Sequence, residues 1–217
     1  MALKRLKIPF EHYRVVEFDQ YAIKSYNAVH GTDFPTMDIC NVSGADMGIE
    51  DKDKYEYIMT YSFPCTDISL AGERKGFEEG SGTRSALLWE VRRILDELKE
   101  TDSLPQILLM ENVSAIHSKD NMPHFRVWLD FLDSLGYSTY VQDLNASDYG
   151  VAQNRERTFA LSILGQYNFN FPNSISLKKC LEDYFEDLSD EQALQLIVKS
   201  EKAKNLLVEL DDENKLC

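Results

Sequence analysis

The strongest constraint on the fold of this chain is the regular alternation of short, strand-like apolar segments with segments of helical periodicity. The stretch 85–98 shows the helical pattern clearly, because its apolar residues recur every three or four positions. Strand-like stretches such as 106–110 are apolar throughout, which suits a strand covered on both faces. The alternation predicts an α/β fold with a mostly parallel sheet and helices on both faces. The predicted strands are Tyr13–Phe18, Tyr55–Ser62, Gln106–Met110, Tyr137–Leu144 and Thr158–Leu164, and the predicted helices are Gln20–His30, Ser85–Leu98 and Met122–Leu135.

The chain divides into two predicted parts after Pro172. Residues 1–172 hold all of the predicted strands, whereas residues 173–217 show only acidic, amphipathic helical patterns. The formal net charge is -14, and residues 181–217 carry half of it, with 11 acidic and 4 basic side chains. The field of the whole chain should therefore repel polyanions, which is unusual for a protein that binds nucleic acid.

The cysteines and the start of the chain bear on the compartment. The four cysteines are widely spaced and form no CxxC pair or Cys/His cluster, so a disulfide framework or a structural zinc site is not expected. No stretch of residues approaches the length of apolar sequence that spans a bilayer, and the first residues lack the apolar part of a signal peptide. These features predict a reduced, soluble, cytoplasmic protein.

Reactive side chains follow or precede the predicted strands, where ligands bind in open α/β sheets. Cys65 follows a proline at a strand end and opens a glycine-rich stretch at 70–85, which reads as a long loop beside a site. Glu111 directly follows an apolar strand, where a poorly solvated carboxyl group could donate a proton. Arg155 and Arg157 alternate, so that an extended segment would point both guanidinium groups to one face.

Each of these signals alone has a plain structural alternative. A single cysteine is more often a small buried apolar residue than a nucleophile. Glu111 could begin a helix, and the two arginines could be an ordinary surface pair. The glycine-rich stretch could be a surface loop with no role in binding.

Together, three motifs in a fixed order resemble the DNA (cytosine-5)-methyltransferases. They are the Pro-Cys segment Phe63–Ser69, the Glu-Asn-Val segment 111–113 and the Gln-x-Arg-x-Arg segment 153–157. The similarity extends over nearly all of residues 1–172. It implies a Rossmann-like methyltransferase fold and identifies residues 1–172 as its catalytic core.

The resemblance also implies a reaction and a set of roles. Cys65 would add to C6 of a cytosine that has been flipped out of the DNA stack, which makes C5 nucleophilic. Glu111 would donate a proton at N3, and Arg155 and Arg157 would hold the base and its backbone. Further substrate contacts would come from Ser69, Asn112 and Gln153.

The implied methyl donor is S-adenosylmethionine. By resemblance, Glu17 would bind the ribose hydroxyls, and Phe18 would pack against the adenine. Asp38 and Ile39 would read the adenine edge. The methionine side would be lined by Pro64 and Leu87.

The chain departs from the family pattern at both ends. A glycine-rich turn is expected about 20 residues before the ribose acid, but Glu17 lies too near Met1 and the first glycine is Gly31. The fold is therefore expected to lack its first strand and cofactor loop, and residues 173–217 stand where a target-recognition domain would begin. Three hypotheses follow: a catalytic portion that acts on DNA, either as a truncated gene product or as one half of a split enzyme with a complementing subunit that supplies the missing parts; a non-catalytic remnant that serves as an interaction module; or an RNA methyltransferase on the same scaffold.

Overall fold

The computed structural model describes residues 2–64, 87–176, 183, 186–187, 189–195, 197 and 199–212. The chain forms two compact units, Met1–Ser176 and Leu177–Cys217. Two of the predicted site residues, Cys65 and Ser69, lie outside the described residues, as does the glycine-rich stretch.

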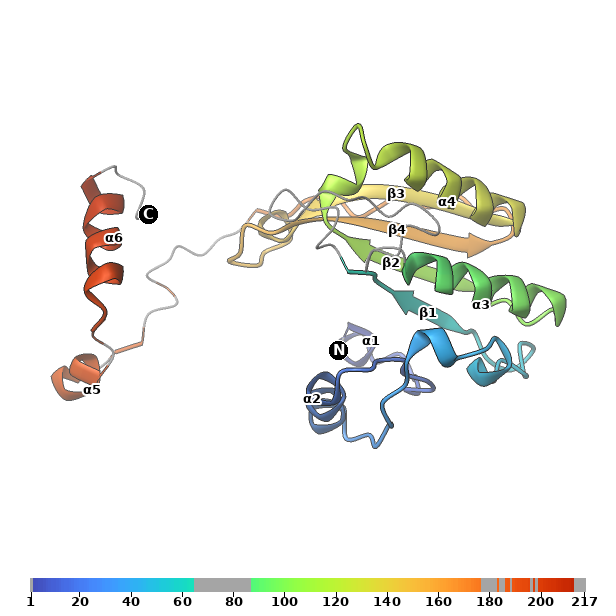
Figure 1. The fold of residues 1–217 in the computed structure, drawn as a ribbon, viewed down its shortest axis with the longest axis horizontal. Coiled ribbons are helices and arrows are strands. Elements are labelled where there is room, and N and C mark those ends of the chain that lie inside the picture. The colour runs from blue at the N-terminus through green and yellow to red at the C-terminus, as the bar shows by residue number, and fades with distance from the viewer. Residues whose placement is uncertain are drawn as a thin grey trace. The chain divides into compact units, whose positions relative to one another are not determined.

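The first unit contains a four-stranded sheet with the order β1-β2-β4-β3 (Figure 1). β1 pairs in parallel with β2, and β4 runs antiparallel to both of its neighbours, so three of the four described strands point the same way. The described strands thus mostly run in one direction, as predicted, and β4 is the antiparallel exception. The reason is that the connection 146–155 contains no α-helix, and such a short link joins antiparallel strands. The strands are β1 (Ile58–Tyr61), β2 (Ile107–Asn112), β3 (Tyr137–Asn145) and β4 (Glu156–Leu164).

Two helices, α3 (Leu88–Glu100) and α4 (Met122–Ser134), lie side by side over one face of this sheet (Figure 1). The Trp89 and Trp128 rings meet edge to face between them, with centroids 6.4 Å apart. Each helix connects strands that point the same way, and successive right-handed crossovers place both helices on the same face. These two crossover helices therefore cover one face of the sheet.

The core lies between these helices and the sheet. Alternate residues of β2 are buried on the helix side, and the five apolar positions of α3 that face the sheet are almost fully buried. Trp128 Nε1 donates a hydrogen bond to the Tyr61 hydroxyl at 3.1 Å, which satisfies both polar groups inside the core. The fully buried side chains include Leu88, Ile94, Leu95, Leu108, Met110, Ile116, Phe125, Trp128 and Leu132.

The amino-terminal part contains two helices, α1 (Ala2–Arg5) and α2 (Gln20–His30). Asp19 caps α2 by accepting from the backbone N–H groups of Tyr21 and Ala22, and Gly31 ends it with φ at 69°. The predicted strand Tyr13–Phe18 is not formed. None of the described strands pairs with it, and an extended segment without a neighbour leaves its backbone groups without ladder partners.

The second unit contains α5 (Asp190–Gln195) and α6 (Glu201–Asp212), and its described residues include no strand. Most of the described side chains of α6 are exposed. The unit boundary at Ser176 falls four residues after the predicted boundary, and the roles assigned to the two parts stay predictions. Within the described parts of both units, no helix is long and apolar enough to cross a membrane.

Candidate functional site

An ion pair between β2 and β4 brings together two of the residues predicted to be catalytic. Glu111 pairs with Phe159 in the antiparallel register, so Arg157, two residues before Phe159, lies on the same face as Glu111. Arg157 Nε lies 3.2 Å from Glu111 Oε1, and Arg155 Nη2 lies 4.0 Å from the same oxygen. The structure therefore gathers the predicted proton donor and both predicted arginines at one end of the sheet.

The surroundings of Glu111 differ from those predicted. An apolar, poorly solvated position is expected from the strand that precedes it, yet the Glu111 side chain is 36% exposed. The reason is that Glu111 is the fifth residue of β2 and points to the face of the sheet opposite α3 and α4. Its carboxylate is therefore partly solvated and lies beside two guanidinium groups.

Asn112 points to the opposite face from Glu111 and is only 2% exposed. Its amide nitrogen donates to the carbonyl oxygen of Phe63 at 3.1 Å, and its amide oxygen accepts from the backbone N–H of Val113. Asn112 thus fastens the end of β2 to the segment that leads through Pro64 to Cys65. Its predicted contact with substrate stays a prediction, and the geometry supports a positioning role instead.

The loop that carries Gln153 and Arg155 is organised by Asn145, a residue absent from the predicted site. Asn145 Oδ1 accepts from the backbone N–H groups of Arg155 at 3.0 Å and Ser147 at 3.2 Å, while its Nδ2 donates to Asn154 Oδ1 at 2.7 Å. An asparagine at a strand end followed by a turn is typical of such backbone bonding, and that signal was available in the sequence. Gln153 itself is exposed.

The residues predicted to bind the cofactor come from two segments that lie against each other. The Met37 N–H donates to the Glu17 carbonyl oxygen at 2.9 Å, which places the segment leading to Asp38 beside Glu17. Asp38 accepts from the Cys40 N–H, and Glu17 accepts from the Asp19 N–H. Glu17 and Asp38 therefore lie on two chain segments that are adjacent to each other.

These residues fit an adenosine moiety in their chemistry. The Phe18 ring is 73% exposed, so an apolar surface is available for stacking against a base. The carboxylate of Glu17 is partly exposed, and carboxylates accept hydrogen bonds from ribose hydroxyls. Ile39 is half-buried against the core, with its carbonyl accepting from Arg93 Nη2 at 3.1 Å. Pro64 and Leu87, both half-buried, are the residues that border the undescribed stretch 65–86.

Arg93 of α3 holds in place the segment 38–42, part of which is predicted to bind the cofactor. Besides the bond to Ile39, its Nη2 donates to the Val42 carbonyl at 2.8 Å, while Glu90 and Glu97 accept from its other nitrogens. Glu97 also accepts from the Gly44 N–H at 2.6 Å. These contacts tie α3 to η1 (Ile39–Asn41), next to Asp38.

Cys40 is poorly suited to be a nucleophile. Burial and the neighbouring Asp38 raise the pKa of its thiol, which lowers the fraction of reactive thiolate. Among the described residues, no group of three or more histidine, cysteine or acidic side chains could hold a metal ion.

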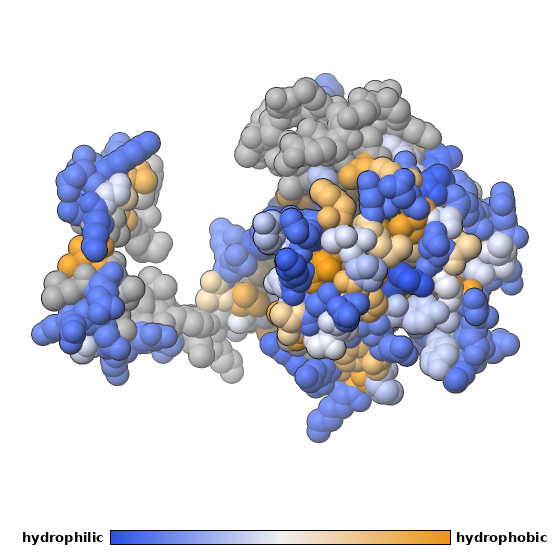
Figure 2. Space-filling view, turned by 60° about the horizontal axis from the view of Figure 1, so that its bottom comes forward, coloured by the Kyte–Doolittle hydropathy of each residue, from blue (hydrophilic) through white to orange (hydrophobic). Residues whose placement is uncertain are grey.

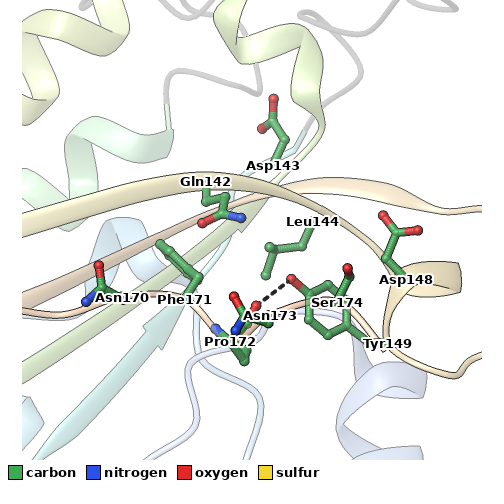
Figure 3. A pocket seen from close by; sticks show the side chains of 10 residues that line it. All are labelled: Gln142, Asp143, Leu144, Asp148, Tyr149, Asn170, Phe171, Pro172, Asn173 and Ser174. Carbon is green, nitrogen blue, oxygen red and sulfur yellow. Dashed lines mark hydrogen bonds between the residues drawn. The ribbon is translucent and has the colours of Figure 1, made fainter. Parts of the chain in front are cut away.

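A cavity of about 470 Å³ lies on the face that carries Arg157 (Figure 3). One wall is Leu144, which is opposite Arg157 in the register of β3 and β4. The Tyr149 hydroxyl donates to the Pro172 carbonyl at 3.0 Å and closes one side of the cavity. The lining is mostly polar and has no basic side chain: Gln142, Asp143, Leu144, Asp148, Tyr149, Asn170, Phe171, Pro172, Asn173 and Ser174.

The sheet order and the site at the strand ends define a Rossmann-like methyltransferase fold. The crystal structure of the Schizosaccharomyces pombe Dnmt2 methyltransferase shares this fold, with a TM-score of 0.64 at 21% identity, over 94% of this chain and 60% of that one. The sequence model of the C-5 cytosine-specific DNA methylases matches residues 1–215, and the chain belongs to this family.

Two curated relatives show how much of a family member is present. The type II methyltransferase M2.ScrFI of Lactococcus lactis subsp. cremoris is 45% identical over 129 residues, which are 59% of this chain and 34% of the relative. The type II methyltransferase M.NlaX of Neisseria lactamica is 36% identical over 177 residues, which are 81% of this chain and 52% of the relative. The chain thus spans about a third to a half of these relatives.

Proposed function

We propose that this chain is the catalytic portion of a DNA (cytosine-5)-methyltransferase that uses S-adenosylmethionine. The observation that carries the proposal is the contact of Arg157 Nε with Glu111 Oε1 at 3.2 Å, at the strand end that Asn112 joins to the Pro64-Cys65 segment. This arrangement supports the proposal because a carboxyl group and two guanidinium groups lie together, and Asn112 at the same strand end is bonded to Phe63, two residues before Cys65. Membership of the family supplies the reaction to which such a set belongs.

The thiolate of Cys65 forms a bond to C6 of cytosine, and the electron pair of the C5–C6 double bond moves toward C5 and the ring. Glu111, in its protonated form, donates its proton at N3 and accepts from the exocyclic amine. Arg157 then stabilises the carboxylate that this proton transfer leaves on Glu111. When bound, S-adenosylmethionine supplies an electrophilic methyl group to C5. A base removes the C5 proton, the S–C6 bond breaks, and Cys65 leaves as the thiolate. The N3 proton returns to the Glu111 carboxylate, which restores the proton donor.

The cofactor proposal depends on Glu17, Phe18, Asp38 and Ile39. Their two segments are joined by the Met37–Glu17 backbone bond, and Arg93 braces the segment of Asp38 and Ile39, so the predicted ribose and adenine contacts come from one framework. Isothermal titration calorimetry with S-adenosylmethionine tests this site by itself. Micromolar binding that Glu17→Gln weakens supports it, and binding no tighter than millimolar in the wild-type chain contradicts it.

We further propose a complementing polypeptide as a partner. Apolar side chains lie exposed among polar ones on the surface of the first unit (Figure 2). On β1 and the preceding segment, Ile58 and Tyr55 are nearly half exposed, and Tyr13 is exposed to a similar degree. A polypeptide that carries the remaining part of a relative should raise methyl transfer when it is added, and an unchanged rate contradicts this partner.

Covalent trapping tests the main proposal. Duplex DNA that contains 5-fluorocytosine cannot lose a proton from C5, so the Cys65 adduct should survive denaturation in the presence of S-adenosylmethionine. The variant Cys65→Ser should give no adduct, and Cys40→Ser serves as the matched control. An RNA probe of matching sequence distinguishes a DNA substrate from an RNA substrate. An adduct with RNA but not with DNA would show that the substrate is RNA.

A further inference from the structure

A second set of side-chain contacts lies at the same strand ends as the Glu111–Arg157 pair, on the other face of the sheet. Asp143 Oδ1 accepts a hydrogen bond from the Thr158 hydroxyl at 2.5 Å and lies 3.3 Å from His117 Nε2. Figure 3 shows the Asp143 carboxylate on the opposite side of β3 from Leu144, the residue that faces Arg157 across the strands. The two sets of contacts therefore lie back to back across the sheet.

Two members of this second set, Thr158 and His117, are close in sequence to residues of the proposed catalytic site. Thr158 directly follows Arg157 and pairs with Asn112 on one side and with Asp143 on the other. His117 ends η4 (Ser114–His117), the short helix that begins two residues after Asn112. Asp143 thus joins β4, which carries Arg157, to the segment that follows Glu111.

The packing around these residues fixes their geometry. Thr158 is fully buried, so its hydroxyl has no water to replace Asp143 as an acceptor. The His117 ring packs edge-on against Phe125 of α4, with centroids 5.6 Å apart. The imidazole is thereby held in the orientation that directs Nε2 to Asp143.

The Glu111–Arg157 pair needs such support. Its two side chains are 36% and 23% exposed, and partly exposed ion pairs contribute little to their own geometry. The His117–Asp143 contact is similarly exposed, at 34% and 38%, so the fully buried Thr158 is the firm part of the support. Arg157 is the second residue of β4, where strand ends open most readily. A bond to a buried hydroxyl at the next residue holds this strand end closed.

We propose that Asp143 and His117 are positioning residues that hold Arg157 against Glu111 by fastening the ends of β2, β3 and β4 from the opposite face. The inference rests on the proposed function for its catalytic meaning. Its structural content is independent of activity: without these contacts, the Arg157 guanidinium no longer stays on Glu111.

The experiment measures solvent exchange of the Arg157 Nε–H in the full chain by ¹⁵N nuclear magnetic resonance, with the signal assigned by its loss in Arg157→Lys. Asp143→Ala and His117→Ala should each speed this exchange about tenfold, as expected when a hydrogen bond to a charged group is lost. Asp143→Asn and His117→Gln keep an acceptor and a donor at the same positions and should restore slow exchange. Asp96→Ala, which breaks only the 3.8 Å pair with Arg92 on α3, is the matched control.

Thr158→Val keeps the branched shape and removes only the hydroxyl, so it tests the same bond should Asp143→Ala fail to fold. Exchange that stays slow in Asp143→Ala, His117→Ala or Thr158→Val overturns the proposal, as does the absence of rescue by Asn and Gln. Methyl transfer measured on the same samples separates the two proposals. If exchange responds as expected while the wild-type chain transfers no methyl group, the positioning inference stands and the proposed function fails.

Discussion

Glu111 and Arg157 meet because two antiparallel strands place them diagonally on one face, with Oε1 and Nε 3.2 Å apart. Arg155 lies 4.0 Å from the same oxygen, so one carboxylate is shared by two cations. This contact combines two motifs that lie more than 40 residues apart in the chain. The contact therefore holds one carboxyl group and two guanidinium groups together at this strand end.

Glu111→Gln tests the role of the carboxyl group. The amide keeps the shape of the side chain but cannot donate an acidic proton, so methyl transfer should fall by about 10²- to 10⁴-fold, the usual contribution of a general acid. Asp96→Asn on α3 changes an acid of the surface and should leave the rate unchanged. The rate is measured as tritium transfer from labelled S-adenosylmethionine to DNA, and a Glu111→Gln rate within a factor of about three of the wild type contradicts the role.

Asn112→Ala tests the attachment of the Pro64-Cys65 segment. The change removes a donor and leaves the buried Phe63 carbonyl without that partner, which should lower the free energy of unfolding by about 1–3 kcal/mol. Urea unfolding followed by circular dichroism measures this loss. Asn168→Ala, at an exposed position, should stay within about 0.5 kcal/mol of the wild type. An equal loss of unfolding free energy in both variants would show that the Asn112 side chain does not stabilise the Pro64-Cys65 segment.

Arg93→Lys tests the framework of the cofactor segment. Lysine keeps the charge but cannot reach the Ile39 and Val42 carbonyls together with Glu90 and Glu97, so the segment around Asp38 should loosen. The dissociation constant for S-adenosylmethionine should rise about tenfold, which corresponds to about 1.4 kcal/mol. Calorimetry compares this variant with Arg126→Lys, an exposed arginine on α4. A dissociation constant that is unchanged in Arg93→Lys would show that Arg93 does not support the predicted cofactor site.

Tyr61 makes the stability of the first unit depend on pH in the alkaline range. Burial raises the pKa of its hydroxyl well above the ordinary value of 10.0. Below pH 10 the tyrosine is neutral in both states, and its contribution to stability is fully present. Above pH 10 the unfolded chain loses the proton while the folded chain keeps it, so the free energy of unfolding falls as pH rises, by up to about 1.4 kcal/mol per pH unit.

The comparison with Tyr61→Phe isolates this effect from other titrating groups. The variant should show a shallower fall above pH 10, together with a loss of about 1–3 kcal/mol at neutral pH, because Trp128 Nε1 loses its acceptor. Tyr21→Phe, at an exposed position of α2, should retain the wild-type slope. Parallel slopes for Tyr61→Phe and the wild type contradict the assignment.

Much of the fold could be predicted from local patterns. The bounds of α2 match the prediction, and those of α4 differ by one residue, because their periodicity and their flanking Asp19 and Gly136 are local features. The direction of β4 depends on the segment before it. Because residues 146–155 contain no α-helix, β4 runs antiparallel to β3. The strand predicted at 13–18 failed because a strand requires a neighbour, which no local pattern provides.

The site was predictable in its members but not in its contacts. Glu111 and Arg157 were chosen from their motifs, whereas their meeting depends on the register that sets Glu111 opposite Phe159. The solvation of Glu111 was wrongly predicted because an apolar strand says nothing about which face its next residue will occupy. Asn145 and Asp143 were missed because their importance lies in bonds to residues of another strand or loop.

The most direct test of the central claim is the mass of the chain after incubation with 5-fluorocytosine DNA, S-adenosylmethionine and the complementing polypeptide. We expect a denaturation-resistant adduct whose mass equals chain plus methylated oligonucleotide, mapped by peptide sequencing to Cys65. The adduct should be absent in Cys65→Ser, present in Cys40→Ser and strongly reduced in Glu111→Gln. No adduct in the wild-type chain under these conditions, or an adduct that maps to another residue, would contradict the assignment of this chain as a cytosine-5 methyltransferase that acts through Cys65.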